Sequence, residues 1–201
     1  TKQPLNIYAE QNIYKKLGLH STTFNPLDKF SRTMIPPTED DKYWRRSRVQ
    51  GHVHDMGAAM LGGVSGHAGI FSNTQDLAVI LQMLLNKGYY NGVRFFKPET
   101  IAYFTSPKYI DNRRGLGFDK PVRERDGSGP TSDLCSFETY GHSGFTGCVM
   151  WADPKYDLIY VFLSNRTFPT MDNKKLISKN VRTNIQDAIY NAIGVKSESV
   201  N

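Results

Sequence analysis

Two apolar runs separated by a short polar turn constrain the fold of this chain more than any other stretch. The first run covers residues 140–152 and the second covers residues 158–163, with five turn-forming residues between them. Aromatic and β-branched runs at this spacing predict an antiparallel hairpin. Because both runs are nearly continuous in hydrophobicity, we expect both faces of the sheet to be covered, as in a sheet with helices packed against it.

The first run opens with a polar, glycine-rich segment. Gly141, Gly144 and Gly147 punctuate the sequence Tyr-Gly-His-Ser-Gly-Phe-Thr-Gly, and His142 and Ser143 add polar side chains at the same place. Small residues let a ligand approach the backbone closely. Backbone N–H groups at a strand edge, next to a His–Ser pair, are suitable donors for the oxyanion that forms in acyl transfer. The segment is therefore a candidate site for acyl chemistry.

The segment resembles the third motif of the penicillin-recognising serine hydrolases, which include β-lactamases, DD-peptidases and related esterases. That motif consists of Lys or His, then Thr or Ser, then Gly, and the matching residues are His142-Ser143-Gly144. Residues 16–19 (Lys-Leu-Gly-Leu) and 115–118 (Gly-Leu-Gly-Phe) are similar to further phrases of the family. The resemblance covers residues 1 to about 194. It looks closest to the β-lactamase-like domain that some bacterial envelope proteins carry behind a glycoside-hydrolase-like domain.

The nucleophile motif of that family does not occur in these 201 residues. In the family the nucleophile lies in Ser-x-x-Lys, and no serine of this chain is followed by lysine three residues later. Residues 89–91 spell Tyr-x-Asn, the family's second motif, but they follow a surface helix, and we interpret them as a coincidence. The resemblance therefore implies that residues 1–201 are the C-terminal portion of a single β-lactamase-like domain. Its helical region would cover about 1–106, and its sheet and C-terminal helix about 115–194.

The resemblance also assigns expected roles to individual residues. His142 would take the place of the motif's basic residue, and Ser143 would hydrogen-bond a substrate carboxylate or carbonyl. Gly144 completes the motif, and the backbone N–H of Phe145 would be one oxyanion donor. Three further residues are candidates for lining the substrate cleft: Gly66, His67 and Asn165. Without a nucleophile, we expect the chain alone to be inactive.

Three classes of function compete. The first is a serine hydrolase that acts on a β-lactam, a D-Ala-type peptide or an ester, and the second is a non-catalytic module that binds cell-wall fragments. The third is a metal-binding protein built on His52, His54 and His67, because His-x-His on a strand places two imidazoles on one face. Glycines crowd that region and no carboxylate lies at a clear ligand spacing, so we expect neither a metal nor another cofactor.

Composition and charge narrow the possible partners. Hydrophobic residues make up 39% and aromatic residues 12% of the chain, which indicates a folded globular protein. No apolar run approaches the length of a membrane span. The net charge is 25 − 19 = +6, but no nucleic-acid-binding motif accompanies it, so a solvated basic face is expected rather than nucleic-acid binding. The expected partners are a small-molecule or peptidoglycan-derived substrate and the N-terminal part of the same domain. By resemblance, the location would be the periplasm or cell envelope.

The predicted fold class is α+β, with an antiparallel sheet flanked by helices, β-lactamase/transpeptidase-like and missing the family's N-terminal strands and nucleophile helix. Strands are expected at about 115–120, 141–152 and 157–164, and helices at 1–17, 73–87, 98–104 and 173–193. Residues 20–51 look irregular. The strand at 158–163 would present an open edge, which favours self-association. The expected buried side of the last helix consists of Leu176, Ile177, Val181, Ile185, Ala188 and Ile189. Cys135 and Cys148 are either free or bridged.

Overall fold

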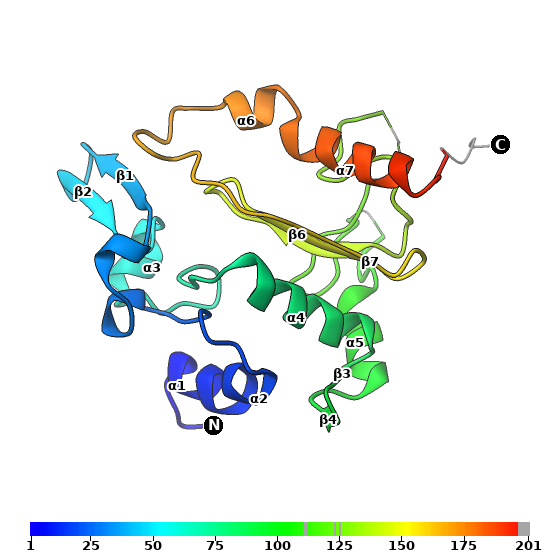
Figure 1. The fold of residues 1–201 in the computed structure, drawn as a ribbon, viewed down its shortest axis with the longest axis horizontal. Helices are drawn as coiled ribbons and strands as arrows, with labels where there is room; N and C mark the ends of the chain where they lie inside the picture. The colour runs from blue at the N-terminus through cyan, green and yellow to red at the C-terminus, as the bar shows by residue number, and fades with distance from the viewer. Residues whose placement is uncertain (111, 123, 125, 197–201) are drawn as a thin grey trace. The chain divides into compact units, whose positions relative to one another are not determined.

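The computed structural model describes residues 1–110, 112–122, 124 and 126–196 (Figure 1). The chain divides into two compact units. The first contains Thr1–Val79 and Leu163–Lys174, and the second contains Ile80–Phe162 and Lys175–Asn201. Helix α4 (Thr74–Leu85) includes the point at which the chain passes from the first unit to the second. No helix in the described ranges is long and apolar enough to cross a membrane.

The first unit begins with a helical segment that contains a widened turn. α1 (Leu5–Ala9), the π-helical η1 (Glu10–Tyr14) and α2 (Lys15–Leu17) follow one another without a break. The helix begins at Leu5 rather than at Thr1, because Pro4 has an extended ψ of 145° and occupies the N-cap position. Gly18 follows the last turn with a φ of 73°, the left-handed conformation that glycine adopts readily. The predicted helix is therefore confirmed, with a later start.

A β-hairpin in the first unit lies within the stretch that the sequence predicts as irregular. After the short 3-10 helices η2 (Pro26–Asp28) and η3 (Arg32–Met34), β1 (Pro37–Asp41) pairs antiparallel with β2 (Ser47–Gln50). Three polar residues of β1 are buried: Thr38, Glu39 and Asp41. Because polar residues occupy buried positions in this strand, the alternation of apolar and polar residues that identifies strands is absent.

Two helices follow the hairpin in the chain. α3 (Met56–Met60) begins after Asp55, whose carboxylate accepts a hydrogen bond of 2.7 Å from the N–H of Ala58. Residues 52–54 therefore lie in a loop that leads to a helix, whereas the metal hypothesis places His52 and His54 on one strand. α4 is confirmed: the side chain of Asn73 accepts from the N–H of Asp76 at 2.8 Å, as expected for an N-cap.

The second unit contains a small hairpin, a helix and the main sheet. β3 (Tyr89–Tyr90) and β4 (Val93–Arg94) form the hairpin, and α5 (Pro98–Thr105) confirms the predicted helix. The strand expected at about 115–120 is wrong, because the region contributes only a single bridge between Asp119 and Gly141. The N–H of Gly115 donates to the carbonyl of Phe118 at 3.0 Å. This turn prevents an extended conformation.

The main sheet has the order β5-β6-β7 and is antiparallel throughout. Its strands are β5 (Tyr140–Ser143), β6 (Val149–Asp153) and β7 (Leu158–Phe162). The single strand predicted over 141–152 is wrong, because residues 144–148 form a tight turn between β5 and β6. In this turn the N–H of Gly144 donates to the carbonyl of Cys148 at 2.7 Å, and Gly147 has a φ of 101°. The predicted hairpin between the two apolar runs is confirmed as β6–β7.

The C-terminal helix covers the sheet, as predicted, but it is divided. α6 (Lys175–Ser178) and α7 (Val181–Ala192) are separated at Asn180, which has a left-handed φ of 50°. Figure 1 shows α7 lying along the sheet, where Ile189 packs against Val149, Trp151 and Tyr160.

The predicted buried side of this helix is wrong in part. Ile177, Ile185 and Ala188 are exposed, whereas Gln186 and Tyr190 are buried. Both polar side chains can be buried because a hydrogen bond offsets the cost of removing each from water. Gln186 accepts from the N–H of Ser132 at 2.9 Å, and the hydroxyl of Tyr190 donates to Asp153 at 2.7 Å. Cys135 and Cys148 form no disulfide.

Candidate functional site

His142 lies exposed at the end of β5, and its two ring nitrogens have different partners. Nδ1 lies 2.8 Å from the carbonyl oxygen of Ser143, and Nε2 lies 3.2 Å from Nη1 of Arg114. A guanidinium group only donates hydrogen bonds, so Nε2 must be the acceptor and the proton must lie on Nδ1. The imidazole in this arrangement is therefore neutral, and the positive charge at this strand end belongs to Arg114.

The arginine beside His142 is held by a buried carboxylate. Asp119 is only 2% exposed and lies 3.4 Å from Nη2 of Arg114 and 2.8 Å from Nε of Arg113. The backbone of Asp119 also pairs with Gly141, next to His142. Asp119 thus fixes both the strand end and the arginine that contacts the imidazole. No sequence motif marks Arg114 or Asp119, so neither residue was predicted as part of the site.

The other three predicted residues of the second unit follow His142 directly. Ser143 is half-buried and lies opposite Val149 in the β5–β6 register. Consecutive strand residues point to opposite faces, so the side chains of His142 and Ser143 diverge. The N–H of Gly144 already donates within the turn, and the side chain of Phe145 is exposed. This strand end can offer a hydroxyl and the neighbouring Arg114 guanidinium to a substrate.

In the first unit, the ring of His67 lies between the side chains of Asp55 and Ser65 and contacts both. Its Nε2 lies 2.9 Å from Oδ1 of Asp55, and its Nδ1 lies 2.7 Å from Oγ of Ser65. Gly66 lies between the serine and the histidine. The N–H of Ala58, followed by the His67 ring, holds the pKa of Asp55 below its ordinary value. The sequence suggested Gly66 and His67 as cleft-lining residues but not the contact with Asp55, which lies 12 positions away.

Asn165, the remaining predicted residue, connects residues 163–174 to β1. Its amide nitrogen donates to the carbonyl oxygen of Pro37. Nearby, Thr167 donates to the carbonyl of Thr38 at 2.8 Å, and the N–H of Asp40 donates to Pro169 at 2.9 Å. The side chain of Asn165 therefore has a structural hydrogen bond in the first unit, and its role toward a substrate stays a prediction.

The three histidines of the metal hypothesis do not share a site. Nε2 of His54 lies 3.1 Å from Glu39, whereas His67 contacts Asp55. Within the described ranges, no three side chains of the His, Cys, Asp and Glu types come together as possible metal ligands.

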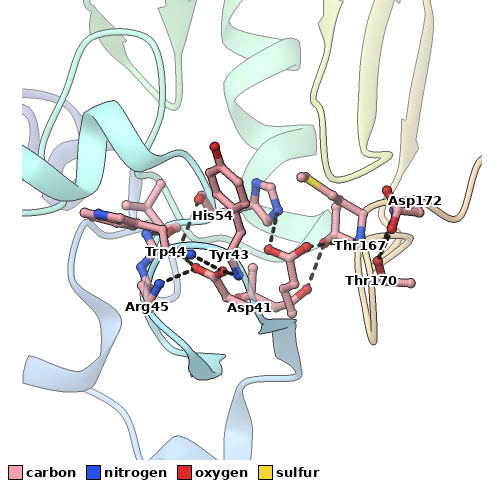
Figure 2. Close-up of polar contacts among 12 residues, drawn as sticks. Asp41, Tyr43, Trp44, Arg45, His54, Thr167, Thr170 and Asp172 are labelled. Carbon is pink, nitrogen blue, oxygen red and sulfur yellow. Dashed lines mark hydrogen bonds and ion pairs between the residues drawn. The ribbon is translucent and has the colours of Figure 1, made fainter.

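A second candidate region, which no sequence motif marks, is the turn between β1 and β2. Figure 2 shows the carboxylate of Asp41 beneath this turn, where it accepts hydrogen bonds from the backbone N–H groups of Tyr43, Trp44 and Arg45 at 2.8, 2.9 and 2.9 Å. These donors, led by the N–H of Trp44, hold the pKa of Asp41 below its ordinary value. The exposed fractions of Tyr43 and Trp44 are 81% and 43%. The buried carboxylate of Asp41 therefore holds a turn in which the side chains of Tyr43 and Trp44 are exposed to solvent.

The chain belongs to the Beta-lactamase family, whose model matches residues 1–181. Among curated relatives, a protein from Escherichia coli K12 named "Putative D-alanyl-D-alanine carboxypeptidase" is 42% identical over 189 residues, which covers 87% of this chain and 43% of that protein. A protein of the same name from Salmonella newport is 40% identical over 189 residues, with 88% of this chain and 43% of that protein covered. The chain thus spans less than half the length of these relatives.

Solved structures show the same fold at low sequence identity. A β-lactamase from Mycobacterium bovis has a TM-score of 0.58 and 20% identity, and the match covers 93% of this chain and 56% of that structure. Simvastatin synthase from Aspergillus terreus has a TM-score of 0.62 and 18% identity, with 94% of this chain and 51% of that structure covered. The predicted α+β fold of the β-lactamase/transpeptidase type is confirmed.

Proposed function

We propose that this chain is the C-terminal portion of a serine hydrolase domain that cleaves a D-alanyl-D-alanine-type peptide bond. The observation that carries this proposal is the 40–42% identity to curated relatives named as carboxypeptidases of that type. The chain covers 43% of those relatives, and its 201 residues contain no Ser-x-x-Lys. We therefore place the nucleophile in the N-terminal part of the domain. A cell-envelope location accords with a substrate of this class.

The strand end at His142 supports recognition of a substrate carboxylate. Ser143 offers its hydroxyl to a carboxylate or carbonyl of the substrate on one face of the strand. Arg114, which contacts His142 on the other face, supplies the positive charge that the neutral imidazole lacks. A planar guanidinium is well suited to a carboxylate because it offers several donors in one plane. In this proposal Phe145 contributes one oxyanion donor through its N–H, and the nucleophile's own N–H contributes the other.

A second candidate is a module that binds cell-wall fragments without chemistry. The absence of Ser-x-x-Lys from these residues favours it if the complete protein also lacks that motif. The metal hypothesis is less favoured, since His54 and His67 each contact a different carboxylate.

The test uses the complete protein and an N-acylated peptide that ends in D-Ala-D-Ala. We expect release of D-alanine, and Ser143→Ala should lower kcat/KM by about tenfold or more, because a hydrogen bond to a charged group is worth about 1.5–3 kcal/mol. Ser178→Ala, on the exposed α6, is the matched control and should leave the rate unchanged. A complete protein that carries Ser-x-x-Lys but releases no D-alanine would contradict the proposal.

A further inference from the structure

We propose that a cavity in the first unit, beside the β1–β2 turn, binds a neutral saccharide of the N-acetylated amino-sugar class. The cavity has a volume of about 460 Å³ and is lined in part by Asn25, Asp28, Trp44, His52 and Gly62. This volume falls in the range of about 300–1,000 Å³ that is typical of small-molecule sites. The choice of an amino sugar rests on the proposed function, because the glycan of the cell wall is built of such sugars.

Trp44 provides a fixed aromatic surface at this cavity. Its backbone is anchored because Asp41, which is 3% exposed, accepts its N–H at 2.9 Å. The guanidinium of Arg45 lies over the indole, 4.7 Å from the ring centroid, and also donates to the carbonyl of Val53 at 2.8 Å. Arg45, which also lines the cavity, covers one face of the ring, so stacking of a ligand requires the other face. A side chain that is ordered before binding loses little entropy when the ligand arrives.

The charges around the cavity favour a neutral ligand. The carboxylate of Asp28 disfavours an anion, and the guanidinium already stacked on Trp44 disfavours a second cation on that ring. Among the described residues, the side chains of Asp28 and His52 have no hydrogen-bond partner, so both remain available to a ligand. A carboxylate accepts several hydrogen bonds and a neutral imidazole both donates and accepts. Sugar hydroxyl groups, which donate and accept, match this set.

Close packing maintains the polar wall of the cavity. The side-chain nitrogen of Asn25 donates to the carbonyl of Gly62 at 3.0 Å. A Cβ atom at Gly63 would lie 2.2 Å from Oδ1 of Asn25, and one at Gly51 would lie 2.6 Å from the side chain of Leu27. Glycine at these two positions therefore allows Asn25 and Leu27, which both line the cavity, to keep their places.

The experiment titrates the 201-residue chain with the N-acetylglucosamine trimer and follows tryptophan fluorescence. The chain has two tryptophans, and Trp151 is only 1% exposed, so a change on binding reports on Trp44. Calorimetry on the same samples gives the affinity. We expect saturable binding that Trp44→Ala weakens by about tenfold, the equivalent of about 1.4 kcal/mol. Tyr43→Ala changes an exposed aromatic neighbour that does not line the cavity and should leave the affinity within about twofold.

A second variant separates ligand binding from the stability of the turn. Ala59→Leu places a larger side chain at the cavity wall on α3 and leaves the Asp41 hydrogen bonds intact, and it should also abolish the fluorescence change. No saturable binding, or equal affinity in Trp44→Ala, would overturn the inference. If the complete protein releases D-alanine but the trimer does not bind, the saccharide site fails and the proposed function stands. If the trimer binds but the complete protein has no hydrolytic activity, the saccharide site stands and the proposed function fails.

Discussion

Nη1 of Arg114 donates a hydrogen bond to Nε2 of His142 over 3.2 Å, and this contact fixes the chemical form of the imidazole. The sequence motif predicts that this histidine takes the place of the family's basic residue, but the contact with Arg114 makes its Nε2 an acceptor rather than a donor. A protonated ring would point a second N–H at the guanidinium, which also carries a positive charge. The arrangement therefore separates two tasks, with the charge on Arg114 and an oriented neutral ring on His142.

We expect nitrogen NMR spectra to show His142 with its proton on Nδ1 at neutral pH. In Arg114→Met, the hydrogen bond to Nε2 is lost while Nδ1 still donates to the carbonyl of Ser143, so the Nε2 signal should move toward that of a ring nitrogen without a hydrogen bond. His20, which makes no side-chain hydrogen bond with the described residues, gives the reference for an unconstrained ring. An Nε2–H tautomer in the unaltered chain would show that the Arg114 contact is not made in solution.

Tyr190→Phe should destabilise the second unit by about 1–3 kcal/mol, because it removes a donor from a buried carboxylate. The Tyr190 hydroxyl donates to Asp153 at 2.7 Å, and both residues are 1% exposed. Burial, followed by the contact with Asp153, raises the pKa of Tyr190, so the hydroxyl keeps its proton.

Urea unfolding measures this effect, and Tyr156→Phe is the matched control. Tyr156 stacks edge-to-face on Tyr190 with 5.6 Å between the ring centroids, but its hydroxyl makes no hydrogen bond with a described residue. The control should change the free energy of unfolding by less than about 0.5 kcal/mol. Equal effects of the two changes would mean that the hydrogen bond from Tyr190 to Asp153 contributes no measurable stability.

The β1–β2 turn should lose stability in acid because of Asp41. Its pKa in the folded state is held below the ordinary value by the N–H groups of Trp44 and Arg45, so the folded state binds fewer protons than the unfolded state in this range. The stabilisation is complete above the unfolded pKa of about 3.9 and is lost as the pH falls through the folded pKa. In Asp41→Asn this part of the pH dependence should be missing. Unfolding curves between pH 6 and pH 2 test the expectation, and parallel pH profiles of the two proteins would refute it.

The predictable parts of the fold are those with local signals. The helix that became α4 has apolar residues at helical spacing, a capping Asn73 and Gly88 after its end, and each signal lies within the segment itself. The hairpin at 37–50 could not be predicted, because its buried positions are polar. Glu39, for example, accepts from the N–H of Met171 at 3.1 Å, a partner 132 positions away. Such a pairing leaves no periodic pattern in either segment.

The candidate site also has residues that a local motif marks and residues whose partners are distant in sequence. His142 and Ser143 could be placed on a strand end because a three-residue motif and adjacent glycines mark them. The partners that define their chemistry are distant in sequence, with Arg114 28 positions before His142. The break between β5 and β6 was not predicted, because Gly144 and Gly147 were interpreted as part of the start of one strand. Here the backbone hydrogen bonds of Gly144 and Gly147 decide the conformation, rather than hydrophobicity.

We expect the open edge of the main sheet to cause weak self-association. In the described part of the chain β7 pairs only with β6, so the outer backbone groups of Leu158–Phe162 have no strand partner. An unpaired, apolar edge is a template for another strand. Sedimentation at several concentrations should show dimers, and Val161→Lys should remove them. Val93→Lys makes the same change on the exposed β4 and should not. A monomer at every concentration would count against this prediction.

The 201-residue chain should not be acylated by a β-lactam or an activated ester. Acyl transfer needs a nucleophile, a base that accepts its proton, and oxyanion donors. Ser143 is poorly placed, since its neighbour His142 points to the opposite face of the strand and its Nε2 accepts from Arg114. The serine with the best geometry is Ser65, whose hydroxyl lies 2.7 Å from Nδ1 of His67. However, the side chains of His67 and Asp55 are 58% and 45% exposed. Electrostatic stabilisation of a transition state is strongest where water is excluded, so we expect little activation of Ser65.

Incubation with a chromogenic β-lactam and a nitrophenyl ester, followed by intact-mass spectrometry, tests this expectation. We expect an unmodified mass and no turnover above a heat-inactivated sample. A stoichiometric adduct would contradict the prediction, and its location would show how. An adduct that disappears in Ser143→Ala would place a nucleophile on β5, whereas one that disappears in Ser65→Ala would show that Ser65, His67 and Asp55 react as a unit. If turnover appears only when the N-terminal part of the domain is added in trans, the nucleophile lies in that part, because only then are the serine, its lysine and the donors at the end of β5 present together.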